Sequence, residues 1–182
     1  MRLNAENVLD DCKRAFELLE NVNSDEQLFR IYWLTELALL STVGEILYKI
    51  DCEENEKVKL IWSNRFKELK ENKDEHKIFW SFIKEERNNI IHEYKVSYSE
   101  DGAHRVSVAS NSVAFYVPES FFGDAGDNLK DELASYTLDS NIYRPMDCAD
   151  AWGSIDCRDL IEKAIFWWEN EIGTIKQKLG SV

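Results

Sequence analysis

Apolar residues recur at helical spacing through the first half of the chain. Within the second apolar stretch the hydrophobic positions run nearly all round a helix, which is typical of the element at the centre of a bundle. The other stretches are amphipathic, with one apolar face each. The pattern therefore predicts four helices in this half, at Asn4–Glu20, Asp25–Ile50, Glu56–Asn72 and Asp74–Tyr94.

The pattern changes after these helices. Ala103–Ala109 and Ser112–Val117 alternate apolar and polar residues around a short polar connection, which predicts a β-hairpin. Pro118–Asp147 is irregular, and long irregular stretches are often lids, interface elements or mobile segments. Helical spacing returns from about Asp150 and continues to Leu179, so a last helix is expected there.

Together these elements predict a mostly α-helical, up-and-down bundle that forms a single domain over residues 1–182. A β-hairpin and an irregular segment are inserted before the C-terminal helix, at about residues 96–148. The composition agrees with a helical chain that has a real core, because 44% of the residues are apolar and only seven are Gly and two are Pro.

The net charge limits the kinds of partner. The formal charge is −13, so the total charge of the domain repels phosphates and disfavours a non-specific nucleic-acid binder. A local basic site on this acidic chain remains compatible with the balance, and so does a basic partner protein.

The cysteines and histidines give no metal or redox pattern. Their spacing matches neither a zinc knuckle nor a redox pair, and the three His are too few and too scattered to complete a metal site. We therefore expect no metal and no cofactor, and free thiols in a reducing compartment. The cysteines are Cys12, Cys52, Cys148 and Cys157.

The sequence also lacks signals for a membrane. Leu28–Ile50 is the most apolar stretch, but charged residues such as Arg30 and Glu45 interrupt it, which indicates a buried helix rather than a membrane span. Residues 1–20 contain no continuous apolar run of the kind that a secretory signal needs. The expected location is the cytoplasm.

The segment that carries chemistry is Arg87-Asn88-Asn89-Ile90-Ile91-His92, late in the predicted fourth helix. His titrates near neutrality and can act as a general base or acid. Arg stays charged and presents a planar fork of donors to a phosphate.

These residues resemble the signature of the HEPN superfamily, in which Arg is followed by four to six residues and then His, commonly with Asn directly after the Arg. Arg87, Asn88 and His92 match those positions. The two Ile before His92 and the Glu-Tyr after it are also typical of the family. The resemblance is local and covers about Trp80–Tyr94, with general agreement in the surrounding helices.

The resemblance implies an HEPN-like bundle with metal-independent endoribonuclease activity of the toxin or phage-defence type. HEPN proteins tend to form homodimers in which two motifs face one cleft, and they frequently pair with an antitoxin on a separate chain. In that role the substrate is RNA, His92 is the general base or acid, Arg87 stabilises the phosphate and Asn88 positions it. Metal-free RNA cleavage needs a base, an acid and a group that stabilises the charged phosphorane. Because one His cannot easily be both base and acid in one step, a symmetric dimer with two copies of the pair suits this reaction.

Helix geometry adds an expectation about the support of this site. At about 100° per residue, Arg87 falls beside the apolar stripe of its helix, whereas Asn88 and His92 share a face well away from it. A charge on the apolar side needs a partner. Glu36 lies on the apolar stripe of the central helix, so we expect an Arg87–Glu36 ion pair or a shared hydrogen-bond network.

Other interpretations of the chain stay open. It could be a non-catalytic HEPN module that binds a protein or a nucleotide, which would suit the acidic surface. It could also be a structural helical protein in which the motif is accidental. Phe166-Trp167-Trp168 could form a platform for stacking bases, although such a run on a helix more often contributes to the core on one side and to an interface on the other.

Overall fold

The computed structural model describes the helices of the chain and five short strands. It covers residues 1–22, 25–94, 103–108, 113–118, 138–143, 145–148 and 153–180. Within these ranges the chain is mostly helical, and the prediction of an α-helical bundle is confirmed. Most of the stretch predicted to be irregular, residues 119–137, lies outside the described residues.

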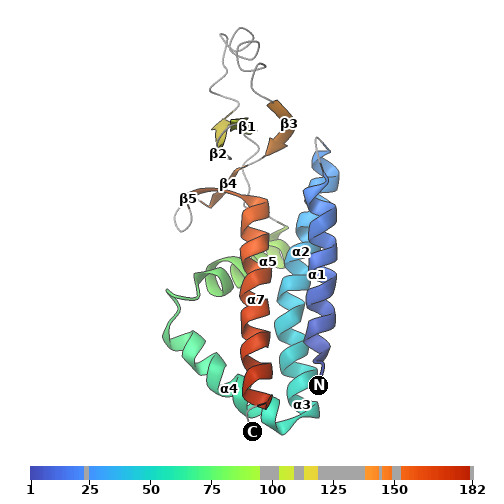
Figure 1. Cartoon of the computed structure of the whole chain (residues 1–182), viewed down its shortest axis with the longest axis vertical. Coiled ribbons are helices and arrows are strands. Elements are labelled where there is room, and N and C mark those ends of the chain that lie inside the picture. The colour runs from blue at the N-terminus through green and yellow to red at the C-terminus, as the bar shows by residue number, and fades with distance from the viewer. Residues whose placement is uncertain are drawn as a thin grey trace.

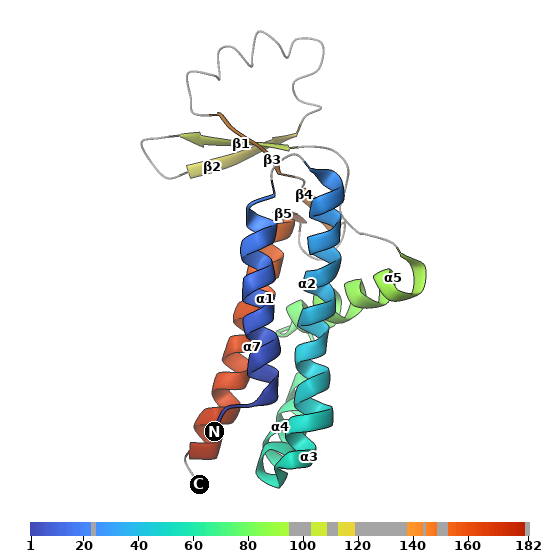
Figure 2. The same ribbon diagram turned by 90° about the vertical axis from the view of Figure 1, so that its right-hand side faces the viewer.

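Three long helices form the centre of the bundle (Figure 1). They are α1 (Asn4–Glu20), α2 (Glu26–Ile46) and α7 (Cys157–Gly180). In both views α2 and α7 run in the opposite direction to α1 (Figure 2). Their apolar faces meet in one core in which the largest side chains, Trp33 and Trp168, are fully buried. Burial of each such side chain removes a large apolar area from water and stabilises the fold by roughly 2–3 kcal/mol.

The chain stays helical beyond the last α-helical turn of α2. It continues through a π-helical segment, η1 (Leu47–Asp51), into the short helix α3 (Cys52–Glu54). Asp51 is buried at this point, and its carboxylate accepts the backbone N–H groups of Asn4 at 2.7 Å and Ala5 at 3.0 Å. The carboxylate thereby satisfies donors at the start of α1 that lack a partner within that helix.

The third and fourth predicted helices lie beside this core. They are α4 (Glu56–Glu71) and a rod made of a π-helical segment, η2 (Ile78–Lys84), and α5 (Glu85–Glu93). Figure 2 shows α5 extending to the side of the long helices. It ends at Tyr94, whose left-handed backbone (φ 51°, ψ 34°) closes the last turn with an N–H bond to the carbonyl of Ile90 at 3.0 Å.

The strands lie in two groups. In the first, β1 (Ala103–Val108) pairs antiparallel with β2 (Val113–Pro118) on one side and with β3 (Leu138–Tyr143) on the other. In the second, β4 (Pro145–Cys148) pairs with β5 (Gly153–Asp156). That these segments form an insertion in an HEPN-like fold stays a prediction.

Two predictions for the last third of the chain are wrong. Part of the stretch predicted to be irregular forms β3 and β4, and the last helix begins at Cys157 instead of at about Asp150. The physical reason is that residues 153–156 pair with β4 as a strand before the helix begins. Among the helices that the structure describes, none is both long and apolar enough to cross a bilayer.

Candidate functional site

Arg87 lies in the first turn of α5 and is half-buried against α2. Its guanidinium donates through Nη2 to Glu45 Oε1 at 3.3 Å and through Nη1 to Asn88 Oδ1 at 3.3 Å. Two of the predicted site residues, Arg87 and Asn88, are therefore in contact. The amide of Asn88 helps to orient the guanidinium because it accepts one of its N–H groups.

The predicted Arg87–Glu36 ion pair is wrong, because Glu45 takes that position. Glu36 and Glu45 are nine positions apart in α2, which at about 100° per residue puts them half a turn apart, on opposite faces. When α5 packs on the face with Glu45, Glu36 is turned away from it. Burial raises the pKa of the Cys12 thiol in α1, and the Glu36 carboxylate, when it is charged, adds to that rise.

Glu36 is fully buried in the core. Neither of its carboxylate oxygens has a hydrogen-bond partner among the residues that the structure describes. Removal from water disfavours the charged form, so burial raises the pKa of Glu36 to about 8. Glu36 is thus a buried carboxyl group of the core that favours its neutral form at pH 7. It does not belong to the surroundings of Arg87, which pairs with Glu45.

His92 occupies the last turn of α5 and is exposed. The apolar side chains on either side of it are exposed as well, Ile91 to 56% and Tyr94 to 70%. Asn88 is half-buried one turn earlier on the same face. The motif is therefore split: Arg87 is half-buried and bonded to Asn88, whereas His92 is exposed in the last turn of the helix.

A groove of about 580 Å³ lies beside Arg87, between α2, α4 and the η2–α5 rod. We call it the Arg87 groove. Four cationic side chains and one carboxylate line it, in a chain whose formal charge is −13. The five charged residues are Lys49, Lys70, Lys84, Arg87 and Glu45. The three Lys could not be predicted as a group from the sequence, because they come from three separate elements and no local spacing links them.

Aromatic side chains form the apolar part of the Arg87 groove. Trp62 and Phe66 come from α4, Phe79 comes from η2, and Tyr48 comes from η1 and has 66% of its surface exposed. The ammonium group of Lys70 lies 4.7 Å from the centre of the Phe66 ring. The groove thus combines positive charge with exposed aromatic surface.

Both π-helical segments contribute to this groove. Tyr48 and Lys49 belong to η1, and Phe79, Ile83 and Lys84 belong to η2. π-Helical turns are less stable than α-helical ones and are found frequently at functional sites. The wall made by α4 is tied to α7 through Arg65, whose guanidinium binds both carboxylate oxygens of the buried Glu171, at 2.8 and 2.7 Å.

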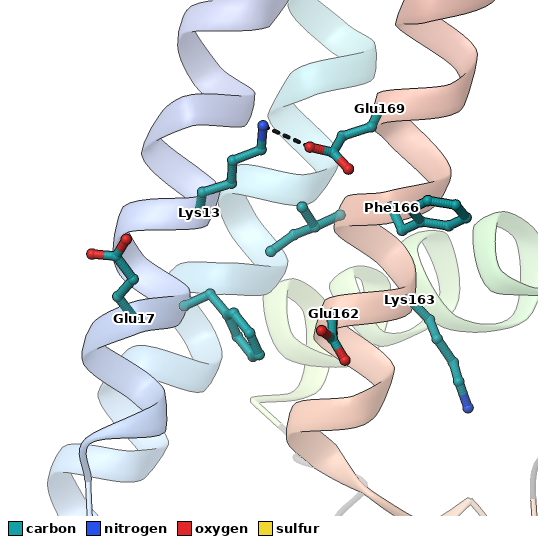
Figure 3. A pocket seen from close by; sticks show the side chains of 8 residues that line it. Lys13, Glu17, Glu162, Lys163, Phe166 and Glu169 are labelled. Atoms are coloured by element: carbon teal, nitrogen blue, oxygen red, sulfur yellow. Dashed lines mark ion pairs between the residues drawn. The ribbon is translucent and has the colours of Figure 1, made fainter.

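A second groove, of about 470 Å³, runs between α1 and α7 (Figure 3), and we call it the Phe166 groove. It has two Lys and three Glu, and Lys13 is paired with Glu169 at 2.7 Å. Phe166 is 62% exposed there, whereas Trp168 is fully buried on the other side of α7. This placement agrees with a Phe-Trp-Trp run that is core on one side and surface on the other.

Other chemistry is sparse in the part of the chain that the structure describes. No three His, Cys, Asp or Glu side chains come together there in a way that could hold a metal ion. Cys12, Cys52 and Cys157 are buried free thiols. His76 is half-buried and accepts a hydrogen bond from the indole N–H of Trp167 at 3.4 Å, which points to a packing role. Comparisons with protein-family models, with curated proteins and with solved structures found no match.

Proposed function

We propose that the protein is a metal-independent endoribonuclease of HEPN type, in which Arg87 binds the scissile phosphate and His92 transfers protons. The observation that carries this proposal is the position of Arg87 at a cation-rich groove in an otherwise acidic chain. A guanidinium beside further cations attracts a phosphate and stabilises the extra charge of a phosphorane.

The proposed reaction needs two imidazoles. One His92 takes the proton of a ribose 2′-hydroxyl, whose oxygen then forms a bond to phosphorus. The bond from phosphorus to the 5′-oxygen breaks, and the other His92 donates a proton to that oxygen. The products are a 2′,3′-cyclic phosphate and a 5′-hydroxyl. Arg87 holds the non-bridging oxygens, and Asn88 keeps the guanidinium in position.

The second His92 would come from a second copy of the chain. Ile91 and Tyr94 are large exposed residues next to His92, and they offer an apolar contact at the end of α5 where a symmetry-related copy can pack. A homodimer formed there brings two His92 side chains together. An antitoxin on a separate chain and a cytoplasmic location remain parts of the same proposal.

The test is cleavage of total RNA by the purified chain in the presence of EDTA. We expect cyclic-phosphate products from the wild type and a loss of roughly 100-fold or more in rate for His92→Ala and Arg87→Ala. Arg14→Ala is the matched control, because Arg14 is an exposed arginine in α1 that is paired with Glu17. Cleavage that stops with EDTA, or that continues unchanged in Arg87→Ala, would contradict the proposal.

The second candidate function is a non-catalytic module that binds a nucleotide. The observation that favours it is that His92 is not among the residues that line the Arg87 groove. In that case the groove binds its ligand and the exposed imidazole takes no part in chemistry. A folded protein that binds nucleotide and leaves RNA intact over the same incubation would support this candidate against the first.

A further inference from the structure

We infer that the Arg87 groove is a binding site for a single nucleotide unit, an aromatic base joined to a phosphate, either as a free nucleotide or within single-stranded RNA. The inference rests on the proposed function in so far as Arg87 takes part in both. It names the ligand class and the residues that bind it, and it does not require that His92 cleaves anything.

The phosphate part of the inference follows from one carboxylate that holds two cations. Glu45 accepts Lys49 Nζ on Oε2 at 2.8 Å and Arg87 Nη2 on Oε1 at 3.3 Å. Both cations therefore converge on a single anion. A phosphate has more charge and more acceptor oxygens than a carboxylate, so it can bind the same two donors. Glu45 then acts as an internal competitor that occupies the anion position when no ligand is bound.

The groove has positive charge that Glu45 does not balance. Lys70 and Lys84 also line it, and within the described residues neither of them is paired with a carboxylate. Their contacts are with aromatic rings: Lys70 lies 4.7 Å from the centre of Phe66, and Lys84 lies 4.7 Å from the centre of Trp80. These contacts leave the ammonium donors available to the oxygens of a ligand.

The base part of the inference follows from the aromatic residues. Tyr48 is directly before Lys49 in the chain, and 66% of its surface is exposed. Its ring can therefore stack on a planar base next to the position where Lys49 binds a phosphate. Phe66 and Phe79 are half-buried and supply apolar surface beneath it. The volume of about 580 Å³ lies in the range of small-molecule sites.

The Phe166 groove serves as an internal comparison. It has a similar volume, and Phe166 is exposed to nearly the same extent as Tyr48, 62% against 66%. Its three carboxylates outnumber its two Lys, so it should repel a phosphate. The lysine and aromatic substitutions in the Arg87 groove therefore have matched substitutions in the Phe166 groove.

The experiment is a calorimetric titration of the full chain at low salt with three ligands, AMP, adenosine and inorganic phosphate. AMP should bind more tightly than either of its parts, and more weakly as salt is added. We expect Lys70→Ala/Lys84→Ala to weaken AMP binding by about tenfold or more, because each charged contact contributes to binding. Tyr48→Ala should weaken it by about tenfold. Glu45→Gln should strengthen it, because the internal competitor is lost.

The matched controls are Lys13→Ala/Lys163→Ala and Phe166→Ala, which should bind AMP like the wild type. Circular dichroism of every variant checks that it is folded. A parallel titration with a five-nucleotide single-stranded RNA separates the two sources of ligand. Binding at least about tenfold tighter than AMP identifies the RNA strand as the ligand, and equal binding identifies the free nucleotide.

The results overturn the inference if the wild type binds neither AMP nor the RNA, or if folded Lys70→Ala/Lys84→Ala binds both ligands like the wild type. They also separate the inference from the proposed function. RNA cleavage with unchanged binding in the groove variants refutes the inference alone. AMP binding that follows the predicted order, together with intact RNA, refutes the proposed cleavage and leaves the groove as the ligand site.

Discussion

α2 has one glutamate on each of two opposite faces, one buried in the core and one exposed to solvent. Glu36 is fully buried, has no hydrogen-bond partner among the described residues, and has a pKa that burial raises to about 8. Glu45 is half a turn away, 44% exposed, and bound to Lys49 and Arg87, and the hydrogen bond from Lys49 lowers its pKa. The partner of Arg87 is therefore decided by the face of α2 on which α5 packs. The apolar pattern of α2 does not show which face that is.

Among the substitutions considered, Glu36→Gln should change the free energy of unfolding most. The folded-state pKa is above the ordinary value of 4.5, so the cost that ionisation of Glu36 adds is absent below about pH 4.5, grows as the pH rises through the interval between the two pKa values, and is complete above about pH 8. Removing the ionisable group should raise the free energy of unfolding at pH 7 by on the order of 3 kcal/mol. Chemical denaturation at pH 5, 7 and 9 measures it, and an equal gain at all three would contradict the assignment.

The next effect concerns Gly44, which precedes Glu45 on the groove side of α2. A Cβ added to Gly44 would lie 2.9 Å from Cη2 of Trp168, which is fully buried, so Gly44→Ala should destabilise the fold by roughly 1–3 kcal/mol. Gly173→Ala is the matched control, since among the described residues no atom beyond the neighbouring backbone of its own helix lies within 4 Å of its added Cβ. That change should stabilise α7 by about 0.5–1 kcal/mol. Thermal unfolding of both variants gives the sign, and a stabilised Gly44→Ala would show that α2 and α7 are farther apart.

Replacing Arg87 tests its ion pair with Glu45 directly and should have a smaller effect on stability. Arg87→Met removes the cation from the Glu45 face, and the loss of a partly exposed ion pair should change the free energy of unfolding by less than about 1 kcal/mol. Because Glu36 lies on the opposite face, its pKa should stay the same in this variant. Carbon-detected NMR titration of the glutamate carboxyl groups follows both residues. A large change at Glu36 would restore the predicted Arg87–Glu36 contact.

The smallest effect on stability is expected for Glu45→Gln. The pair with Lys49 is between exposed side chains in one helix, so water and salt screen it, and the change should be within about 0.5 kcal/mol. The contrast with Glu36→Gln is the point of the measurement. A loss in Glu45→Gln as large as the gain in Glu36→Gln would mean that the groove face is far less exposed to solvent than we describe.

The helices could be predicted from the sequence because their periodicity is local. α1 has the predicted bounds, and the apolar stretch after it forms α2 and η1. The start of α7 could not be predicted, because the pairing of residues 153–156 with β4 overrides the local pattern. The alternation predicted strands only in the region of β1 and β2, and no comparable local pattern predicted β3, β4 or β5.

The candidate site divides in the same way. Arg87, Asn88 and His92 were found because they are close in the sequence and share one helix. Their surroundings were missed, because Lys49, Lys70 and Lys84 meet only through the packing of η1, α4 and η2. Glu36 was predicted as the partner because it lies on the apolar stripe of the central helix, but Arg87 is 33% exposed and pairs with Glu45, which is 44% exposed.

Positive charge and aromatic surface lie together in the Arg87 groove of an acidic protein. We propose that this groove binds a nucleotide. The most direct measurement is the change in backbone amide NMR signals of the labelled chain as AMP is added. We predict that the largest shifts occur at Tyr48, Lys49, Lys84 and Arg87, with none at Lys163 and Phe166. Shifts centred on the Phe166 groove, or no shifts at millimolar AMP, would contradict the claim.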